Sequence, residues 1–136
     1  MKILAASDLT ARSDRALARA FLLAREHEAE LRIAHVVDAE LPVAFRTHAV
    51  EWAAKMLSGE SEKLGAATGV KAAIDVRTGK VGADIARMSN APDTDLIALG
   101  AQDQPPADRR SFSDTTAGRI LRSSRAATLL VRNEAV

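Results

Sequence analysis

The most informative stretch of the sequence is residues 95–100, which read Asp-Leu-Ile-Ala-Leu-Gly. Its apolar residues are consecutive rather than alternate, which is typical of a strand covered on both faces. We predict a strand over Asp95–Leu99 and four more, in runs of the same character, at Lys2–Ala6, Leu31–Val37, Lys71–Val76 and Ala127–Arg132. Longer amphipathic segments separate these runs. The alternation predicts an α/β fold with a mostly parallel, five-stranded sheet and helices on both faces.

The segments between the runs carry apolar residues at helical spacing. The predicted helices extend from Thr10 to about Glu28, from near His48 to Leu64, from near Gly79–Val81 to just before Asn90, and over Ser113–Ser124. Gly65 and Gly69 are expected to close the second helix. Segment Asp38–Thr47, which contains Pro42, is predicted as a long loop or a broken helix start.

Composition narrows the class of protein. The chain has 136 residues, of which 47% are hydrophobic, and this is the size of one domain over residues 1–136. It has no cysteine, which excludes disulfides, thiolate zinc sites and cysteine nucleophiles and suits a reducing cytoplasm. The formal net charge of +1 is far from the basic footprint of a nucleic-acid binder. The apolar stretches have strand length, which is too short to cross a membrane. Taken together, these features lead us to expect a cytoplasmic protein that binds neither nucleic acid nor membrane.

Three segments, taken in order, resemble the universal stress protein family. They are residues 3–10 (ILAASDLT), residues 31–38 (LRIAHVVD), and residues 95–100 with 114–122 and 128–132 (DLIALG, DTTAGRILR and TLLVR). The resemblance covers essentially the whole chain. It implies a Rossmann-like fold of the adenine nucleotide alpha hydrolase type. It also implies a homodimer through the final strand, Ala127–Arg132, whose apolar edge is an association hazard unless it is paired.

The resemblance also implies a nucleotide pocket. Many members of the family bind ATP with a loop of the form G-x2-G-x9-G-[S/T], whose glycines let backbone N–H groups approach the phosphates. Gly100 matches the first glycine, Asp103 and Asp114 stand at the other two, and the loop is one residue longer than the pattern. Thr115 matches the hydroxyl position, and Thr116 follows as a further backbone donor.

Two more residues join the candidate pocket through the resemblance. Asp8, at the end of the first strand, matches a residue beside the nucleotide, and the backbone of Val36 matches the position that meets adenine. An Asp at the start of a helix is also what capping alone requires. We therefore expect Asp8 to line the cleft, with loop ordering as its main role.

Two functions remain open on these residues. A carboxylate about 4 Å from a phosphate charge repels it by about 1 kcal/mol in water and about 4 kcal/mol at a protein surface. Asp103 and Asp114 then favour a non-enzymatic, dimeric stress-response or signalling module with a degenerate nucleotide pocket and a protein partner. If Arg109 and Arg110 neutralise phosphate, or if a carboxylate holds Mg²⁺, the alternative is an ATP-binding switch with weak or no hydrolysis.

The remaining polar residues are given structural interpretations. No nucleophile, base and oxyanion donor converge in the sequence, so no catalytic residue and no metal ligand are predicted. His35 is expected to be a hydrogen-bonded structural histidine and Trp52 to be partly buried in the core. Residues expected at the surface or in turns are His27, His48, Gly79, Arg119, Arg122 and Arg125.

Overall fold

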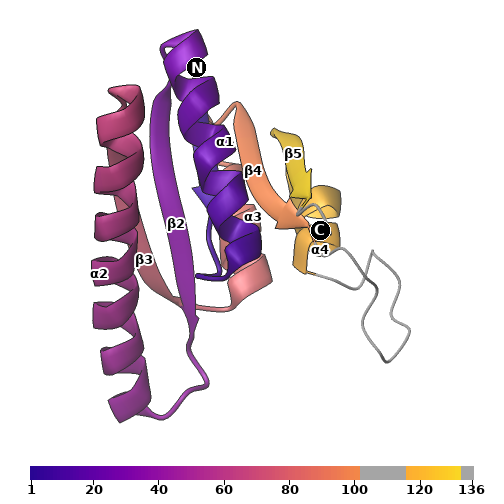
Figure 1. The fold of residues 1–136 in the computed structure, drawn as a ribbon. Helices are drawn as coiled ribbons and strands as arrows, with labels where there is room; N and C mark the ends of the chain where they lie inside the picture. Colours follow the sequence, from indigo (N-terminus) through magenta and orange to yellow (C-terminus); the bar gives the residue numbers. More distant parts are fainter. Residues whose placement is uncertain (102–115, 133–136) are drawn as a thin grey trace.

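The computed structural model describes residues 1–101 and 116–132. Within them the chain forms one five-stranded sheet in the order β3-β2-β1-β4-β5, and every neighbouring pair is parallel (Figure 1). The strands are β1 (Lys2–Ala6), β2 (Glu30–Asp38), β3 (Ala72–Gly79), β4 (Leu96–Ala101) and β5 (Ala127–Arg132). The predicted α/β fold is therefore confirmed, and the sheet is wholly parallel across the described residues.

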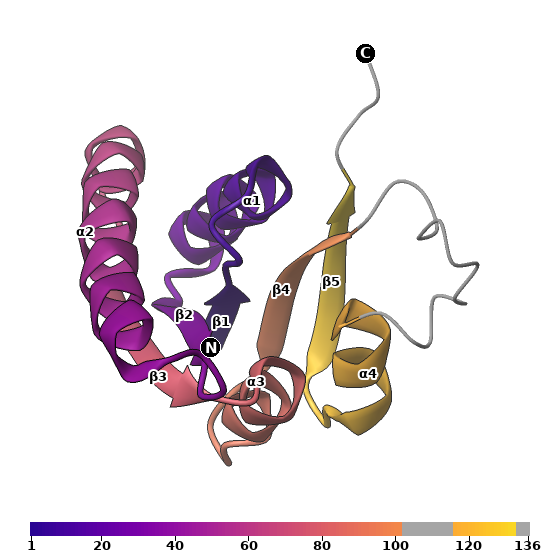
Figure 2. The same ribbon diagram turned by 90° about the horizontal axis from the view of Figure 1, so that it is seen from below.

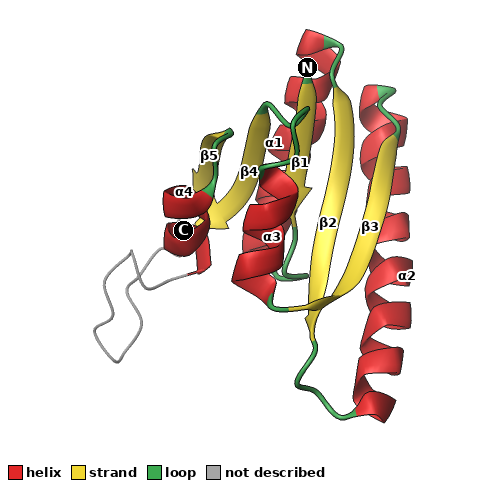
Figure 3. Cartoon of the chain, turned by 180° about the vertical axis from the view of Figure 1, so that it is seen from behind, coloured by secondary structure: helices red, strands yellow, loops and turns green. Residues whose placement is uncertain are grey.

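Helices cover both faces of the sheet. The four described helices are α1 (Ala11–His27), α2 (Val43–Thr68), α3 (Val81–Ser89) and α4 (Thr116–Ser123). Seen from below, α1 and α2 lie on one side of the sheet and α3 and α4 on the other (Figure 2). The view from behind shows α3 and α4 in front of the strands (Figure 3). None of the helices within the described ranges is long and apolar enough to cross a membrane.

The strands bury side chains in two cores because successive residues point to opposite faces. On β1, Ile3 and Ala5 pack with α1 and α2, whereas Leu4 packs with α3 and α4. Phe21 of α1 is fully buried in the first core, and Ile120 of α4 is buried in the second. This two-sided burial explains why the apolar residues of the strands are consecutive in the sequence.

The second predicted helix was wrong at both ends. The observed α2 starts at Val43 rather than near His48, because Pro42 occupies the N-cap position and its fixed φ suits the entry to a helix. Only three residues, 39–41, separate β2 from this proline. At the other end Gly65 lies inside the helix, and Gly69 alone closes it with a left-handed φ of 78°.

Charged side chains align the start of β1 with the segment before β4. At the start of β1, Lys2 donates its backbone N–H to Asp95 at 2.8 Å and its ammonium to Asp93 at 2.5 Å. The hydrogen bond and charge of Lys2 lower the pKa of the Asp93 carboxyl, and Asp93 raises the pKa of Lys2. Both side chains are exposed, so the pair aligns β1 with the segment before β4 rather than contributing much stability.

The fold predicts a large difference between two phenylalanines. Replacing Phe21, which is fully buried, with Ala removes a ring from the first core and should lower the free energy of unfolding by about 3–5 kcal/mol. Phe45 is 67% exposed on α2, so Phe45→Ala should change it by less than about 0.5 kcal/mol. Urea denaturation followed by circular dichroism measures both. Equal effects would contradict the assignment of α1, rather than the outer surface of α2, to the core.

Candidate functional site

A pocket of about 240 Å³ lies at the carboxyl ends of β1 and β4. From β1 the chain adds β2 and then β3 toward one edge of the sheet. It then returns to the other side of β1 and adds β4 and β5 toward the opposite edge. The crossovers thus leave β1 and β4 in opposite directions, which is where open parallel sheets bind ligands. We call this cavity the strand-end pocket; it is lined by Ala6, Ser7, Asp8, Ser13, His35, Val36, Val81, Ile85, Leu99, Gly100, Ala117 and Ile120.

Asp8 organises the turn from β1 into α1. Its Oδ1 accepts hydrogen bonds from the backbone N–H of Thr10 at 3.0 Å, from the Thr10 hydroxyl, and from the Ser13 hydroxyl at 2.5 Å. The Ser13 oxygen in turn accepts the N–H of Asp8 at 2.8 Å. These bonds hold Leu9 at a left-handed φ of 64°, a backbone conformation that is unfavourable for leucine. Asp8 therefore has the loop-ordering role expected from the sequence, and it also lines the pocket.

His35 is fixed by one backbone group. Its Nδ1 lies 2.7 Å from the carbonyl oxygen of Ser7. A carbonyl can only accept, so Nδ1 carries a proton and donates it there. The side chain is half-buried between β1 and β2, and the predicted structural histidine is confirmed. His27 and His48 are exposed, also as predicted.

The other wall of the pocket is apolar. Val36, Ile85, Leu99 and Ile120 are all at least 95% buried in the folded chain. They come from β2, α3, β4 and α4, so this wall exists only after the strands and helices have assembled. The lining also includes the hydroxyls of Ser7 and Ser13 and the carboxylate of Asp8 from the β1 turn, so the pocket has both an apolar and a polar part.

The structure brings together three of the five candidate pocket residues. Asp8, Val36 and Gly100 all line the strand-end pocket. Thr116 is the first residue of α4, whose next residue, Ala117, also lines the pocket. The remaining residues of the predicted phosphate loop lie outside the described residues: Asp103, Arg109, Arg110, Asp114 and Thr115.

Nine of the twelve lining residues were not among the candidate pocket residues predicted from the sequence, and four of them are instructive. Ile85 and Ile120 were assigned to helical apolar stripes, and nothing in one helix shows whether such a residue faces a core or a cavity. Ala117 was assigned to the same apolar stripe as Ile120, and Ser13 was not singled out. A Ser five residues after the Asp that ends a strand is a signal for Ser13, because one turn of helix brings that hydroxyl back to the carboxylate.

Two other expectations concern metal ions and Trp52. Across residues 1–101 and 116–132, no group of three or more His, Asp and Glu side chains is arranged to hold a metal ion. Trp52 was expected to be partly buried in the core, but it is 49% exposed on α2 and belongs to neither buried cluster. Its neighbour Ala53 occupies the buried face of the helix instead.

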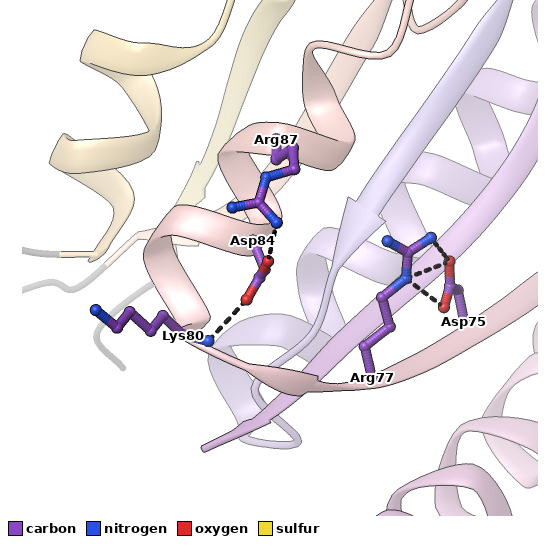
Figure 4. A network of polar contacts seen from close by, with 5 residues as sticks. All are labelled: Asp75, Arg77, Lys80, Asp84 and Arg87. Carbon is purple, nitrogen blue, oxygen red and sulfur yellow. Dashed lines mark hydrogen bonds and ion pairs between the residues drawn. The ribbon is translucent and has the colours of Figure 1, made fainter. Parts of the chain in front are cut away.

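The start of α3, beside the pocket, depends on Gly79. Asp84 accepts the backbone N–H of Lys80 at 2.7 Å and binds the Arg87 guanidinium at 2.8 Å (Figure 4). A Cβ on Gly79 would lie 2.0 Å from Oδ2 of Asp84, so any larger residue displaces this carboxylate. Gly79 is thus more than a turn residue, because its missing side chain makes room for the cap of α3.

Two glycine substitutions test this account. Gly79→Ala should lower the free energy of unfolding by about 0.5–2 kcal/mol, because its Cβ displaces the Asp84 carboxylate that caps α3. Gly59→Ala is the control: its Cβ meets nothing within 4 Å in the middle of α2, and it should stabilise the protein by about 0.5–1 kcal/mol. Thermal or urea unfolding measures both variants. Stabilisation by Gly79→Ala would show that Asp84 does not cap α3.

The fold and the pocket together define a parallel α/β protein with a pocket at its strand ends. Residues 1–132 match the model of the universal stress protein family. The chain belongs to this family, in agreement with the resemblance seen in the sequence. A comparison with curated proteins gives no match.

Solved structures with the same fold include several members of the family. Universal stress protein UspA from Lactobacillus plantarum superposes with a TM-score of 0.85 at 18% identity, covering 97% of each chain. A universal stress protein in complex with cAMP gives 0.74 at 18% identity over 98% of each chain. The universal stress protein from Archaeoglobus fulgidus in complex with dAMP gives 0.75 at 16% identity over 96% of each chain. At these identities the likeness shows the common fold.

Proposed function

We propose that this protein is a non-enzymatic, nucleotide-responsive module of the universal stress type, which binds an adenine mononucleotide in the strand-end pocket. The observation that carries the proposal is the pocket itself. Its Val36, Ile85 and Ile120 wall suits a flat base, and the β1 turn offers hydroxyls and a carboxylate to a sugar. The two relatives bound to cAMP and dAMP support a nucleotide with one phosphate.

The size of the pocket supports a small nucleotide. Its volume of about 240 Å³ is below the roughly 300–1,000 Å³ usual for drug-sized ligands. A base with part of its sugar matches this volume better than a complete triphosphate. The phosphates would extend beyond Gly100, which matches the first glycine of the family's phosphate loop.

Charge supports the same preference. Asp103 and Asp114 replace two glycines of the family's phosphate loop, and each carboxylate near a phosphate weakens binding by about 1–4 kcal/mol. The penalty grows with the charge of the ligand. We therefore propose that AMP and cAMP bind more tightly than ATP, and that the pocket is degenerate toward the triphosphate.

The arrangement of the polar groups favours a binding role over catalysis. The Ser13 hydroxyl is bonded to Asp8, the Ser7 hydroxyl accepts the N–H of Leu9 at 3.1 Å, and His35 Nδ1 is directed to a backbone oxygen. These groups order the turn beside the ligand. We propose that a bound ligand changes the position of the β1 turn and of α1 through these groups. We also propose that the protein acts in the cytoplasm.

Calorimetric titration with AMP, cAMP and ATP, each with and without Mg²⁺, tests the nucleotide proposal. We expect micromolar AMP or cAMP binding and at least tenfold weaker ATP binding. Gly100→Val places a branched side chain on the pocket wall and should abolish binding. The control Gly59→Val, on an open face of α2, should leave it unchanged.

Two results would overturn this order of affinities. Tighter binding of ATP that requires Mg²⁺ would make the carboxylates metal ligands and establish the ATP-dependent switch. Absence of heat with every nucleotide at millimolar concentration would mean that the pocket holds no nucleotide, and the proposed function would be wrong.

We also propose that the protein acts as a homodimer through β5. This strand is one edge of the sheet, and its central Thr128, Leu129 and Leu130 are uncharged and half-buried. The other edge, β3, carries charges: Arg77 binds Asp75 through two nitrogens, and this pairing raises the pKa of Arg77 (Figure 4). Charged side chains protect an edge from pairing, so β5 is the better candidate for association.

Light scattering after size exclusion tests the dimer. The wild-type protein should have twice its chain mass of 14.5 kDa at micromolar concentration. Leu129→Lys brings two like charges together at the interface and should shift the equilibrium toward monomer, whereas Thr78→Lys on the β3 edge should not. A monomeric wild-type protein, or equal effects of the two lysines, would refute pairing through β5.

A further inference from the structure

A second and larger cavity lies on the outer side of α3 and α4. Its volume is about 660 Å³, and it shares only Val81 with the strand-end pocket. We call it the outer groove; it is lined by Asp38, Ala39, Glu40, Lys80, Val81, Gly82, Ala83, Ala86, Arg119, Arg122 and Ser123. The β2–α2 connection forms one wall, and the two helices form the other.

The helical wall is basic. Lys80, Arg119 and Arg122 are exposed, and none of the three makes an ion pair among the described residues. Arg119 crosses the first turn of α3, where its Cδ lies 4.0 Å from the place that a Cβ on Gly82 would occupy. A helix N-terminus carries positive partial charge, so the Arg119 and Lys80 cations there repel it and each other.

The carboxylate in the first turn of α3 is bonded to other groups. Asp84, in the first turn of α3, is already bonded to the Lys80 N–H and to Arg87, and it does not line the groove (Figure 4). Lys80, Arg119 and Arg122 outnumber the two carboxylates that line the groove, Asp38 and Glu40, and this excess of positive charge favours a bound anion. Arginine side chains bind phosphate oxygens bidentately, which makes a phosphate group the best match for Arg119 and Arg122.

The opposite wall is acidic. Asp38 and Glu40 are both exposed, and Asp38 accepts the backbone N–H of Glu40 at 2.9 Å, which fixes its carboxylate at the edge of the groove. Carboxylates in this position repel a ligand that is anionic throughout. Carboxylates do accept hydrogen bonds from sugar hydroxyls, as acidic residues do from ribose in nucleotide sites, so this wall suits a sugar.

We propose that the outer groove binds a phosphorylated sugar, with the phosphate on Lys80, Arg119 and Arg122 and the sugar hydroxyls on Asp38 and Glu40. The ligand is a free sugar phosphate or the ribose phosphate end of a nucleotide, since both present the same groups. This site is separate from the strand-end pocket and does not depend on the function proposed for it. Through Val81 the two cavities contact the same turn of α3.

Calorimetry with ribose 5-phosphate tests the proposal, with AMP, ribose and inorganic phosphate titrated alongside. Ribose 5-phosphate should bind below about 1 mM and more tightly than ribose or phosphate. Arg119→Gln and Arg122→Gln keep the aliphatic stem and should each weaken it about tenfold or more. Glu40→Gln should weaken it severalfold. Arg125→Gln, an equally exposed arginine outside the groove, is the matched control.

Gly100→Val separates the two cavities, because it alters only the strand-end pocket. Ribose 5-phosphate binding should survive this substitution. If AMP binding also persists in Gly100→Val but is lost in Arg119→Gln, the ligand of the outer groove is the ribose phosphate end of a nucleotide. The proposal is overturned if ribose 5-phosphate shows no saturable binding, if inorganic phosphate binds equally well, or if Arg125→Gln weakens binding as much as Arg119→Gln.

Discussion

The two-sided burial of β1 and β4 is the constraint on which the rest of this structure depends. A parallel strand cannot be joined to its neighbour by a hairpin, so each connection crosses a face of the sheet. With β1 in the centre, these crossovers diverge between β1 and β4 and leave a space above the strand ends. The packing that buries Ile97 and Ala98 thus also creates the strand-end pocket.

Much of the fold could be predicted from the sequence, because strands that are buried on both faces appear as runs of consecutive apolar residues. β1 and β5 have the predicted bounds, and the other strands differ by one to three residues at an end. The errors arise where one residue has two meanings. Pro42 was interpreted as a loop signal but starts α2, and Gly65 was interpreted as a stop but is tolerated inside it. The fixed φ of Pro42 suits the entry to a helix, and Gly65 leaves room for the carbonyl oxygen of Val70, which would lie 2.9 Å from a Cβ at that position.

The candidate site could be predicted only where a polar residue stands at a recognisable place in the chain, such as the turn between a strand and a helix. Asp8 lies in the short turn between β1 and α1, so its local role and its place at the cleft follow from the sequence. Ile85 and Ile120 line the pocket because α3 and α4 approach the strand ends from the same face, which no local pattern encodes. The outer groove is lined by residues more than 80 positions apart in the sequence, such as Asp38 and Arg122. Its acidic and basic walls face each other only in the folded chain, so neither wall alone predicts it.

The unequal edges of the sheet limit how large an assembly can grow. Continuous hydrogen bonding from molecule to molecule, as in a fibril, needs two open edges on every subunit. Here Asp75 and Arg77 lie on β3, and β5 alone has an uncharged centre. In the proposed dimer, pairing through β5 uses the same edge of both partners and leaves only the charged β3 edges outside. Such a sheet can double in width but cannot polymerise.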